Sequence, residues 1–379
     1  MKADSYTSPQ VIGPEASRDA VLRFLSEHPE FAAPYRSNRH FALTLARSAY
    51  VEMSTRCNLR CEGCYYFNGE YDQVKENDEL ADWDAFFADQ AEKGTRFIYL
   101  VGAEPSLEPE RLAIASKYIK RGLIGTNGIR KIDPAIPYML HISVWGAPKT
   151  DARLRGADAF SKALRNYQGQ TGRVLFVYTL TPKNITEAHE VLERVQGAGL
   201  NMTFNMYSPT HTYLDRLSAA NDPQSKFFRL SSKSDNLCWD NASLRLARST
   251  VSRLMEEFPD TLVYSKAYND WVTQPGPRFE LDENDVAPHC LSRVGGSLSL
   301  FGPDLEPVPG GKCCTSDVDC STCRLYSGGL SSRLKLREAD LRSGEAFQSW
   351  LDICDHLFKI YIYTPSWQQE RPSAQLLSA

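Results

Sequence analysis

Three cysteines stand close together in the stretch STRCNLRCEGCYYF, residues 54–67. Cys57, Cys61 and Cys64 have the spacing CxxxCxxC, and no fourth cysteine or histidine lies beside them. A structural zinc site normally has four protein ligands in a closed tetrahedron. Three thiolates can instead hold a 4Fe-4S cluster and leave one iron open to a small ligand. The motif therefore predicts an open, catalytic metal centre, unless a distant residue completes a zinc site.

A second group of cysteines occurs between residues 290 and 323. An extended run after the first of them, a Gly-Pro-Asp turn and a second extended run predict a hairpin that brings the group together. Four thiolates can close a site there, and zinc fits that number as well as a 4Fe-4S cluster does. Cys313 and Cys314 are adjacent in the middle of the group, so either of them is a candidate ligand. The members are Cys290, Cys313, Cys314, Cys320 and Cys323.

Short apolar runs alternate with amphipathic stretches between residues 49 and 207, which predicts buried parallel strands joined by helices. Six strands are expected, at 49–55, 96–102, 123–128, 138–146, 173–181 and 201–207. Helices are expected at 82–94, 108–122, 158–169 and 185–199, with only a short connection after Gly128. This order predicts an α/β fold, a partial (β/α)6 TIM-like barrel, whose chemistry lies at the carboxyl ends of the strands. The three-cysteine loop begins where the first strand ends.

We expect four parts in the chain, separated by changes in composition. Residues 1–47 form an N-terminal helical cap with one helix at 17–31, and residues 48–273 form the barrel and a linker. The linker contains a predicted helix at 241–259 and a predicted strand at 261–268. A Pro/Gly break at 274–279 begins a small C-terminal iron-sulfur hairpin domain, 274–335, and a helix and tail follow at 336–379.

The composition excludes several classes of partner. The net charge of −4 and the lack of a concentrated Lys/Arg tract give no footprint for nucleic acid or for an anionic membrane. The sequence has no signal-peptide pattern and no apolar run long enough to span a bilayer, so we expect a soluble, cytoplasmic protein. In that reducing compartment ten cysteines indicate metal ligands rather than disulfides.

The motif CNLRCEGC resembles the signature of the radical S-adenosylmethionine (SAM) enzymes. GAEP at 102–105 is similar to the family's GGEP motif, with Ala103 in place of the second glycine, and TNG at 126–128 also resembles a family motif. The resemblance implies that Cys57, Cys61 and Cys64 hold a SAM-binding 4Fe-4S cluster. It also implies contacts to SAM from a set of residues around the barrel mouth: Gly102, Ala103, Glu104, Asn127, Ser143, Thr179 and Tyr65.

The activity that this resemblance implies is reductive cleavage of SAM to a 5′-deoxyadenosyl radical, which removes a hydrogen atom from an unactivated carbon. A one-electron donor such as flavodoxin or ferredoxin is the implied partner. The segment that holds the second cysteine group resembles the twitch half of a SPASM domain, which implies an auxiliary 4Fe-4S cluster. Such a cluster could accept an electron from the substrate radical, donate one, or order the fold.

The substrate we expect is a polar small molecule, such as an amino sugar, nucleoside or amino acid, that undergoes dehydrogenation, dehydration or epimerisation in natural-product biosynthesis. The 47 residues before the first strand are too few for a leader-peptide-binding domain, and no cobalamin-binding domain precedes the barrel. A peptide maturase and a lipid-modifying enzyme are the alternatives within the family. A catalytically silent metal-binding scaffold is the alternative outside enzymes.

We expect a further set of residues to act on the substrate. In an epimerisation a thiol must return a hydrogen atom to the substrate radical, and Cys238 in a polar loop is the candidate. Cys354 recurs at helical spacing with apolar residues, which predicts a buried small side chain. Side chains that could face the substrate are His141, Trp145, Asn205, Tyr207 and His211.

Overall fold

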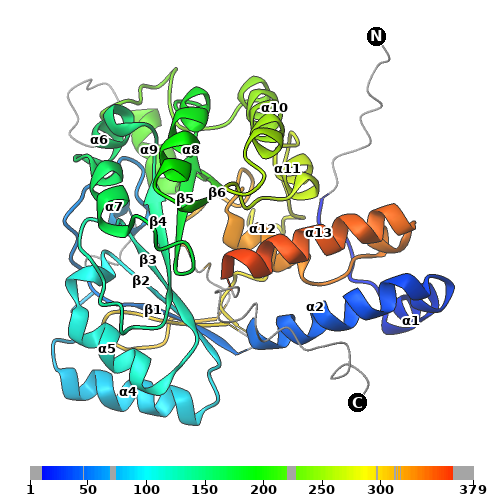
Figure 1. Ribbon diagram of the computed structural model, residues 1–379, viewed down its shortest axis with the longest axis horizontal. Helices are drawn as coiled ribbons and strands as arrows, with labels where there is room; N and C mark the ends of the chain where they lie inside the picture. Colours follow the sequence, from blue (N-terminus) through cyan, green and yellow to red (C-terminus); the bar gives the residue numbers. More distant parts are fainter. Residues whose placement is uncertain are drawn as a thin grey trace.

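A computed structural model describes residues 11–45, 47–68, 74–219, 228–295, 298–310, 313, 315 and 317–361. Its centre is a seven-stranded parallel sheet with the order β6-β5-β4-β3-β2-β1-β7 (Figure 1). The strands are β1 (Ser48–Glu52), β2 (Phe97–Val101), β3 (Gly122–Thr126), β4 (Met139–Val144), β5 (Val174–Leu180), β6 (Asn201–Met206) and β7 (Leu298–Phe301). The predicted α/β class with a partial barrel is confirmed, and the six strands predicted from the sequence are all present.

Helices cover the convex face of this sheet. They are α4 (Leu80–Glu92), α5 (Pro109–Tyr118), α7 (Ala159–Tyr167) and α8 (Ala188–Gly197), whose buried apolar residues belong to the larger apolar core. Helix α6 (Pro148–Arg155) lies apart from this core, and its Leu154 belongs to a separate small cluster with Tyr207. Because side chains alternate across a strand, Ile98 and Leu100 of β2 point to this side and pack in the larger apolar core. The connection between β3 and β4 contains no helix, in agreement with the short connection that the sequence predicts.

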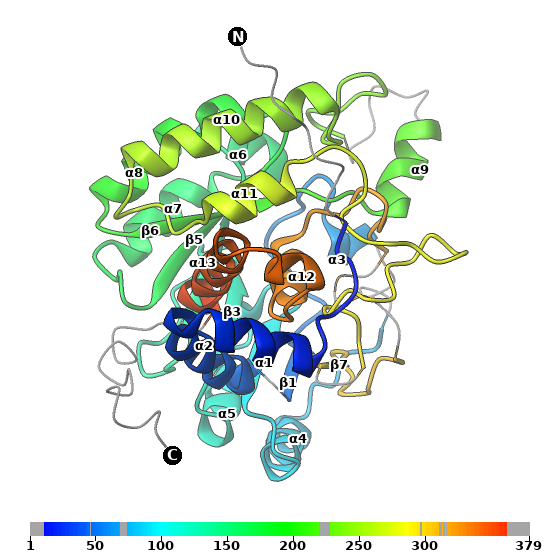
Figure 2. The same ribbon diagram turned by 90° about the vertical axis from the view of Figure 1, so that its right-hand side faces the viewer.

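The concave face of the sheet is filled from the C-terminal end of the chain. Helix α13 (Gly344–Tyr361) lies between α11 (Lys266–Val272) and α2 (Ala32–Leu45) and contacts α12 (Tyr326–Arg333) (Figures 1 and 2). His356 of α13 is hydrogen-bonded to Thr203 of β6 at 3.2 Å, deep inside the sheet's concavity. Cys354 is buried in this helix, as its spacing predicts. The helix therefore blocks the amino-terminal half of the barrel and leaves the carboxyl-terminal half for a ligand.

The N-terminal segment contains more helix than expected. Helix α1 (Arg18–Glu27) and a 3-10 turn, η1 (Pro29–Phe31), match the predicted helix, but α2 follows at once and was missed. Its sequence mixes polar and apolar residues and contains Pro34, which is tolerated because it falls in the first turn. Phe41 contacts Phe358 of α13 at 5.3 Å between ring centroids, and Tyr35 contacts Trp350 of the same helix at 6.1 Å.

One prediction for the region after β6 differs from the structure. Helices α9 (His211–Ala219) and α10 (Asn241–Glu257) are followed by α11, so the predicted strand at 261–268 is wrong. Only Leu262 forms a bridge, to Met202, and Ser265 then caps α11 by accepting a hydrogen bond from the Tyr268 backbone. The apolar residues that suggested a strand instead bury one face of this connection.

The C-terminal cysteine segment is joined to the barrel more closely than expected. Strand β7 pairs in parallel with β1, which the sequence did not reveal. Part of the predicted hairpin is present, because Val308 donates to the Leu300 carbonyl at 2.8 Å and Arg293 forms an antiparallel bridge with Cys313. The boundary near residue 274 stays a prediction. Among the described residues, none of the helices combines the length and apolarity required to cross a bilayer.

Candidate active site

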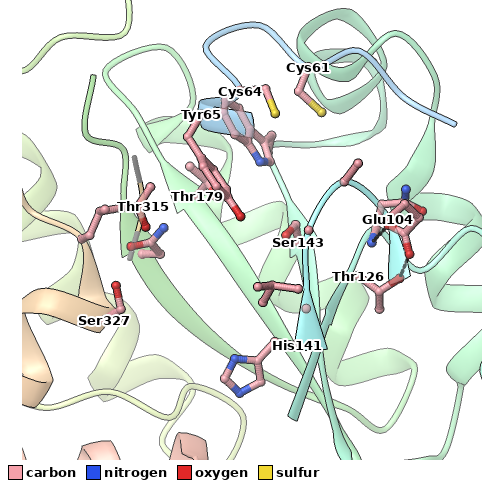
Figure 3. A pocket seen from close by; sticks show the side chains of 18 of the residues that line it. Cys61, Cys64, Tyr65, Glu104, Thr126, His141, Ser143, Thr179, Thr315 and Ser327 are labelled. Carbon is pink, nitrogen blue, oxygen red and sulfur yellow. Dashed lines mark hydrogen bonds between the residues drawn. The ribbon is translucent and has the colours of Figure 1, made fainter. Parts of the chain in front are cut away.

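A cavity of about 290 Å3 opens on the concave face at the carboxyl ends of the strands. The three-cysteine loop and the turns after β2 and β3 line one end of it. Tyr326 and Ser327 of α12 and Tyr361 at the end of α13 line the other end (Figure 3). The cavity therefore lies between the first cysteine motif and the segment that carries the second cysteine group.

The three cysteines of the first motif lie on one loop that begins at the end of β1. Cys57, Cys61 and Cys64 all line the cavity and influence one another electrostatically. Burial raises the pKa of the Cys57 thiol to about 11 and that of Cys64 to about 12. A protein without metal therefore holds these thiols protonated at neutral pH, and metal binding would displace the protons. The loop is tight at Gly63, which has a φ of +66° beneath the Tyr207 hydroxyl.

The GAEP and TNG turns are locked to each other by hydrogen bonds. Glu104 accepts from the Thr126 hydroxyl at 2.5 Å, from the Ser106 backbone at 3.1 Å and from the Asn127 backbone at 2.8 Å. The Asn127 side chain donates to Asn58 in the cysteine loop at 2.7 Å. The carboxylate of Glu104 is thus already occupied by donors of the chain, and it holds both turns in place beside the three thiols.

All the residues that the sequence predicts to contact SAM line this one cavity. Ser143 and Thr179 face it from β4 and β5, and Tyr65 projects toward them from the start of α3 (Tyr65–Asn68) (Figure 3). The remaining predicted contacts also line it, namely Gly102, Ala103, Glu104 and Asn127. Their role in binding SAM stays a prediction.

Arg155 is a site residue that sequence reasoning missed. Arg155 is 2% exposed, lines the cavity and acts electrostatically on Cys61. It donates to the Ser143 carbonyl at 2.5 Å and pairs with Asp151 at 3.4 Å. The stretch PKTDARLR is typical of a solvated polar helix, and nothing in it signals that this arginine turns inward. The residue supplies positive charge behind the cysteine loop.

The structure places some of the residues that could face the substrate at the cavity and others away from it. His141, Trp145, Asn205 and Tyr207 line the cavity, whereas His211 begins α9 outside it. Cys238 is not among the lining residues of this cavity. It packs against a small apolar cluster that includes Tyr207, and burial raises its pKa to about 11. Its predicted role as a hydrogen-atom donor stays a prediction, and the structure gives it no direct opening to the cavity.

The deep end of the cavity is lined by aromatic rings around a neutral histidine. Burial lowers the pKa of His141 to about 4. Since the Ile360 carbonyl can only accept, the Nε2 atom of His141 donates to it at 2.6 Å, and Nδ1 accepts from the Tyr326 hydroxyl at 3.1 Å. The rings of Tyr326 and Tyr361 stack at 5.8 Å. This end of the cavity offers rings and hydroxyl groups but no formal charge from these residues.

The second cysteine group also converges in the structure. Burial raises the pKa of the Cys290, Cys320 and Cys323 thiols, and charge repulsion from Cys313 raises each of the three further. Cys314 lies outside the described residues. Within the part of the chain that the structure describes, no three His, Cys, Asp or Glu side chains are arranged to hold a single metal ion. The ligand set of this group stays a prediction.

One buried carboxylate near the first motif has no donor at all. Both oxygens of Glu52, the last residue of β1, lack a hydrogen-bond partner in the described structure. Burial raises the pKa of this carboxyl to about 8. Its Oε2 atom borders Gly102 of the GAEP turn, which lines the cavity, whereas Glu52 itself does not line it. The fit to the predicted cluster rests instead on the three thiols that line the cavity, since thiolates are the usual ligands of a 4Fe-4S cluster.

Comparisons with known proteins give remote likenesses. No protein-family model matches the sequence. Among solved structures, SuiB of Streptococcus suis bound to its precursor peptide SuiA is 12% identical, with 98% of this chain and 76% of that chain covered and a TM-score of 0.48. The structure of anSMEcpe with bound AdoMet and the Cp18Cys peptide is 13% identical, with 83% and 97% covered and a TM-score of 0.46.

A curated protein is similar at the level of sequence. Fe-coproporphyrin III synthase of Methanosarcina barkeri is 26% identical over an alignment of 160 residues, and the match covers 38% of this chain. The match spans 39% of the length of that relative. The synthase is a radical SAM enzyme, so the resemblance to the radical SAM enzymes that the cysteine motif predicts is confirmed over that part of the chain.

Proposed function

We propose that this chain is a radical SAM enzyme that removes a hydrogen atom from a substrate held between its two cysteine groups. The observation that carries the proposal is the common cavity: three thiols of one loop and the GAEP and TNG turns all line it. When bound, a reduced 4Fe-4S cluster and SAM supply a 5′-deoxyadenosyl radical.

The chain's own residues would hold these groups at the barrel mouth. Cys57, Cys61 and Cys64 are the proposed cluster ligands, and their loop is fixed to the TNG turn through Asn58. Glu104 keeps the two turns in register. Because Arg155 lies behind the loop, it would stabilise the negative charge of a thiolate-ligated cluster.

The finer proposal concerns the substrate. We keep a polar small molecule as the first candidate, and the deep end of the cavity favours an uncharged ring with hydrogen-bonding groups, such as a sugar or a nucleoside. Two observations support this: His141 is neutral there, and Tyr326, Tyr361 and Ser327 supply rings and hydroxyl groups. The cavity also extends to the segment of the second cysteine group, so an auxiliary cluster there would lie on the far side of the substrate.

The test is anaerobic purification followed by reduction with dithionite in the presence of SAM. The protein should be brown, and it should release 5′-deoxyadenosine. Cys57→Ala should abolish this release, whereas Cys238→Ala, which also removes one partly buried thiol but lies outside the cavity, should preserve it. A colourless, zinc-containing protein that leaves SAM intact would contradict the proposal and favour a scaffold.

The substrate is then identified by deuterium transfer into 5′-deoxyadenosine from labelled candidates. The panel should contain amino sugars, nucleosides, free amino acids, a peptide and a lipid. Label arriving from a ring-bearing neutral compound is the expected result. Label from the peptide or the lipid alone would replace the small-molecule proposal with a maturase or a lipid-modifying enzyme.

A further inference from the structure

Two residues beside the second cysteine group carry buried donors that the chain leaves unused. Arg324 directly follows Cys323 and is 5% exposed, and Tyr268 of α11 is 1% exposed. The Nε atom of Arg324 and the hydroxyl of Tyr268 both lack a hydrogen-bond partner in the described structure. The charge of a Cys323 thiolate acts on both side chains. Since buried donors are normally satisfied, these two point to an acceptor that the chain does not supply.

The guanidinium of Arg324 is also a buried cation without a carboxylate. Its Nη1 and Nη2 atoms donate to the carbonyl oxygens of Val272 at 2.6 Å and of Gly276 at 3.1 Å, and none of its described hydrogen bonds reaches an acidic side chain. Burial and then repulsion from Arg324 lower the pKa of the nearby Arg278 to about 10. Positive charge therefore accumulates here, and a buried charge is normally paired with an opposite one.

A pair of glycines in α12 leaves room at the cysteine group. A Cβ atom on Gly328 would lie 3.2 Å from the Cys290 Sγ atom. A Cβ atom on Gly329 would clash with the Tyr268 hydroxyl. Larger residues at these positions would push the thiol or the hydroxyl away. The helix that follows the cysteine group therefore packs against one of its thiols and against the unused hydroxyl at adjacent positions.

We propose that Arg324 and Tyr268 supply the buried charge and the hydroxyl donor that raise the reduction potential of an iron-sulfur centre held by the second cysteine group. Four thiolates give such a centre a negative charge, which increases on reduction. A guanidinium without a carboxylate stabilises the reduced form more than the oxidised form, and a hydroxyl donor acts in the same direction. A raised potential fits a centre that accepts an electron better than one that donates it.

This inference depends on the iron-sulfur centre proposed for the second cysteine group and not on cleavage of SAM at the first motif. The experiment therefore measures the reduction potential of the second centre, without turnover. The full chain is purified anaerobically with the three cysteines of the first motif replaced by alanine, so that only the second centre binds iron. An iron content of about four per chain shows that the centre is loaded. Its EPR signal is then followed in a redox titration.

The variants in this background are Arg324→Met, Arg324→Lys and Tyr268→Phe. Arg173→Met is the matched control, because the described hydrogen bonds of Arg173 also go to backbone carbonyls, at the start of β5. Arg324→Met should lower the ratio of reduced to oxidised centre at a fixed potential at least tenfold, which is a shift of about 59 mV for one electron. Tyr268→Phe should shift the potential less, in the same direction.

Arg324→Lys keeps the positive charge and should recover most of the shift, whereas Arg173→Met should leave the potential unchanged. A native potential in Arg324→Met overturns the role of Arg324, and a native potential in Tyr268→Phe overturns that of Tyr268. An equal shift in Arg173→Met also overturns the proposal, because the effect would then not depend on closeness to the cysteine group.

Should Arg324→Met lose the centre, Arg324→Gln removes the charge but keeps an N–H donor for the carbonyl oxygens, and it should lower the potential in the same direction. Should the background without the first motif fail to fold, the titration is done on the native chain, where the signal that SAM leaves unaltered belongs to the second centre. A folded chain that binds zinc or no metal at the second group overturns the proposal.

The proposed function is judged separately, by release of 5′-deoxyadenosine from the native protein. Absence of this release, together with a lowered potential in Arg324→Met, would contradict the proposed function and support the role of Arg324. Release of 5′-deoxyadenosine with unchanged potentials in all the variants would support the proposed function and overturn this inference.

Discussion

The carboxylate of Glu104 accepts a hydrogen bond from the Asn127 backbone nitrogen at 2.8 Å and thereby joins the turn after β2 to the turn after β3. The same carboxylate accepts from the Thr126 hydroxyl at 2.5 Å, so two donors of the TNG turn depend on it. Glu104 is 2% exposed, and solvent cannot replace these contacts. The GAEP and TNG motifs thus act as one unit, although 20 residues separate the two motifs in the sequence.

Replacing Glu104 should damage both turns together. Glu104→Ala leaves the Asn127 N–H and the Thr126 hydroxyl buried without an acceptor, which costs about 1–3 kcal/mol for each group. We expect a lower free energy of unfolding in urea and a loss of SAM affinity. Glu104→Gln keeps one acceptor oxygen, so its stability and its SAM affinity should lie between those of Glu104→Ala and those of the native protein. A Glu104→Ala variant with native stability and native SAM affinity would show that the turns hold each other without this carboxylate.

Gly63 should be essential for the shape of the cysteine loop. It has a φ of +66°, and a Cβ atom there would lie 2.2 Å from the Tyr207 hydroxyl. Gly63→Ala should therefore lower the iron bound per chain and the melting temperature, because both strain and a clash oppose the native loop. Gly197→Ala is the matched control, since a Cβ at this helical position meets nothing within 4 Å. Equal iron content in the two variants would contradict the expected constraint.

The barrel could be predicted from the sequence because its signals are local. Buried apolar strands such as β5 and amphipathic helices such as α8 carry their period in consecutive residues. The spacing of Cys57, Cys61 and Cys64 likewise lies in one loop, and the cavity-lining positions of Ser143 and Thr179 follow from the ends of their strands. Local pattern and strand order together therefore predicted most of the candidate site.

The parts that were missed depend on contacts between distant segments. The extended run that contains β7 was expected as one arm of a hairpin, but its pairing with β1, about 250 residues earlier, has no local signal in the sequence. The inward turn of Arg155 depends on Asp151 and on the Ser143 carbonyl of another element. The Glu52 carboxyl has no hydrogen-bond donor around it in the described structure, and only the three-dimensional packing can show this.

Glu52 should give the stability of the protein a characteristic pH dependence. Burial raises its pKa from 4.5 to about 8, so the folded state holds this proton more tightly than the unfolded state does. The contribution to the free energy of unfolding is fully present below about pH 4.5 and is lost as the pH rises through about 8. The check is urea unfolding of the native protein and of Glu52→Gln across this pH range, without SAM. The free energy of unfolding should fall with rising pH in the native protein and not in Glu52→Gln. Parallel curves would mean that Glu52 is not the group that holds the proton.

The Asp151–Arg155 pair should behave as a buried unit. Arg155→Met leaves the Asp151 carboxylate buried without its cation, and breaking such a pair costs about 3–5 kcal/mol. We expect a strongly reduced free energy of unfolding, and the double variant Asp151→Asn/Arg155→Met should regain part of it. Arg155 acts on Cys61 more strongly than Asp151, which opposes it, so the double variant should still lower the reduction potential of the iron centre. An unchanged potential would restrict Arg155 to a structural role.

The second cysteine group should account for half of the iron. If both groups hold 4Fe-4S clusters, the native protein binds about eight irons per chain, and Cys290→Ala or Cys320→Ala should reduce this to about four. Both thiols lie in the group whose members influence one another's pKa, whereas Cys238 lies elsewhere, so Cys238→Ala should keep about eight. Release of 5′-deoxyadenosine without substrate should survive in Cys290→Ala, because the first motif is intact. Retention of all the iron together with loss of zinc in Cys290→Ala would instead assign a zinc site to this group.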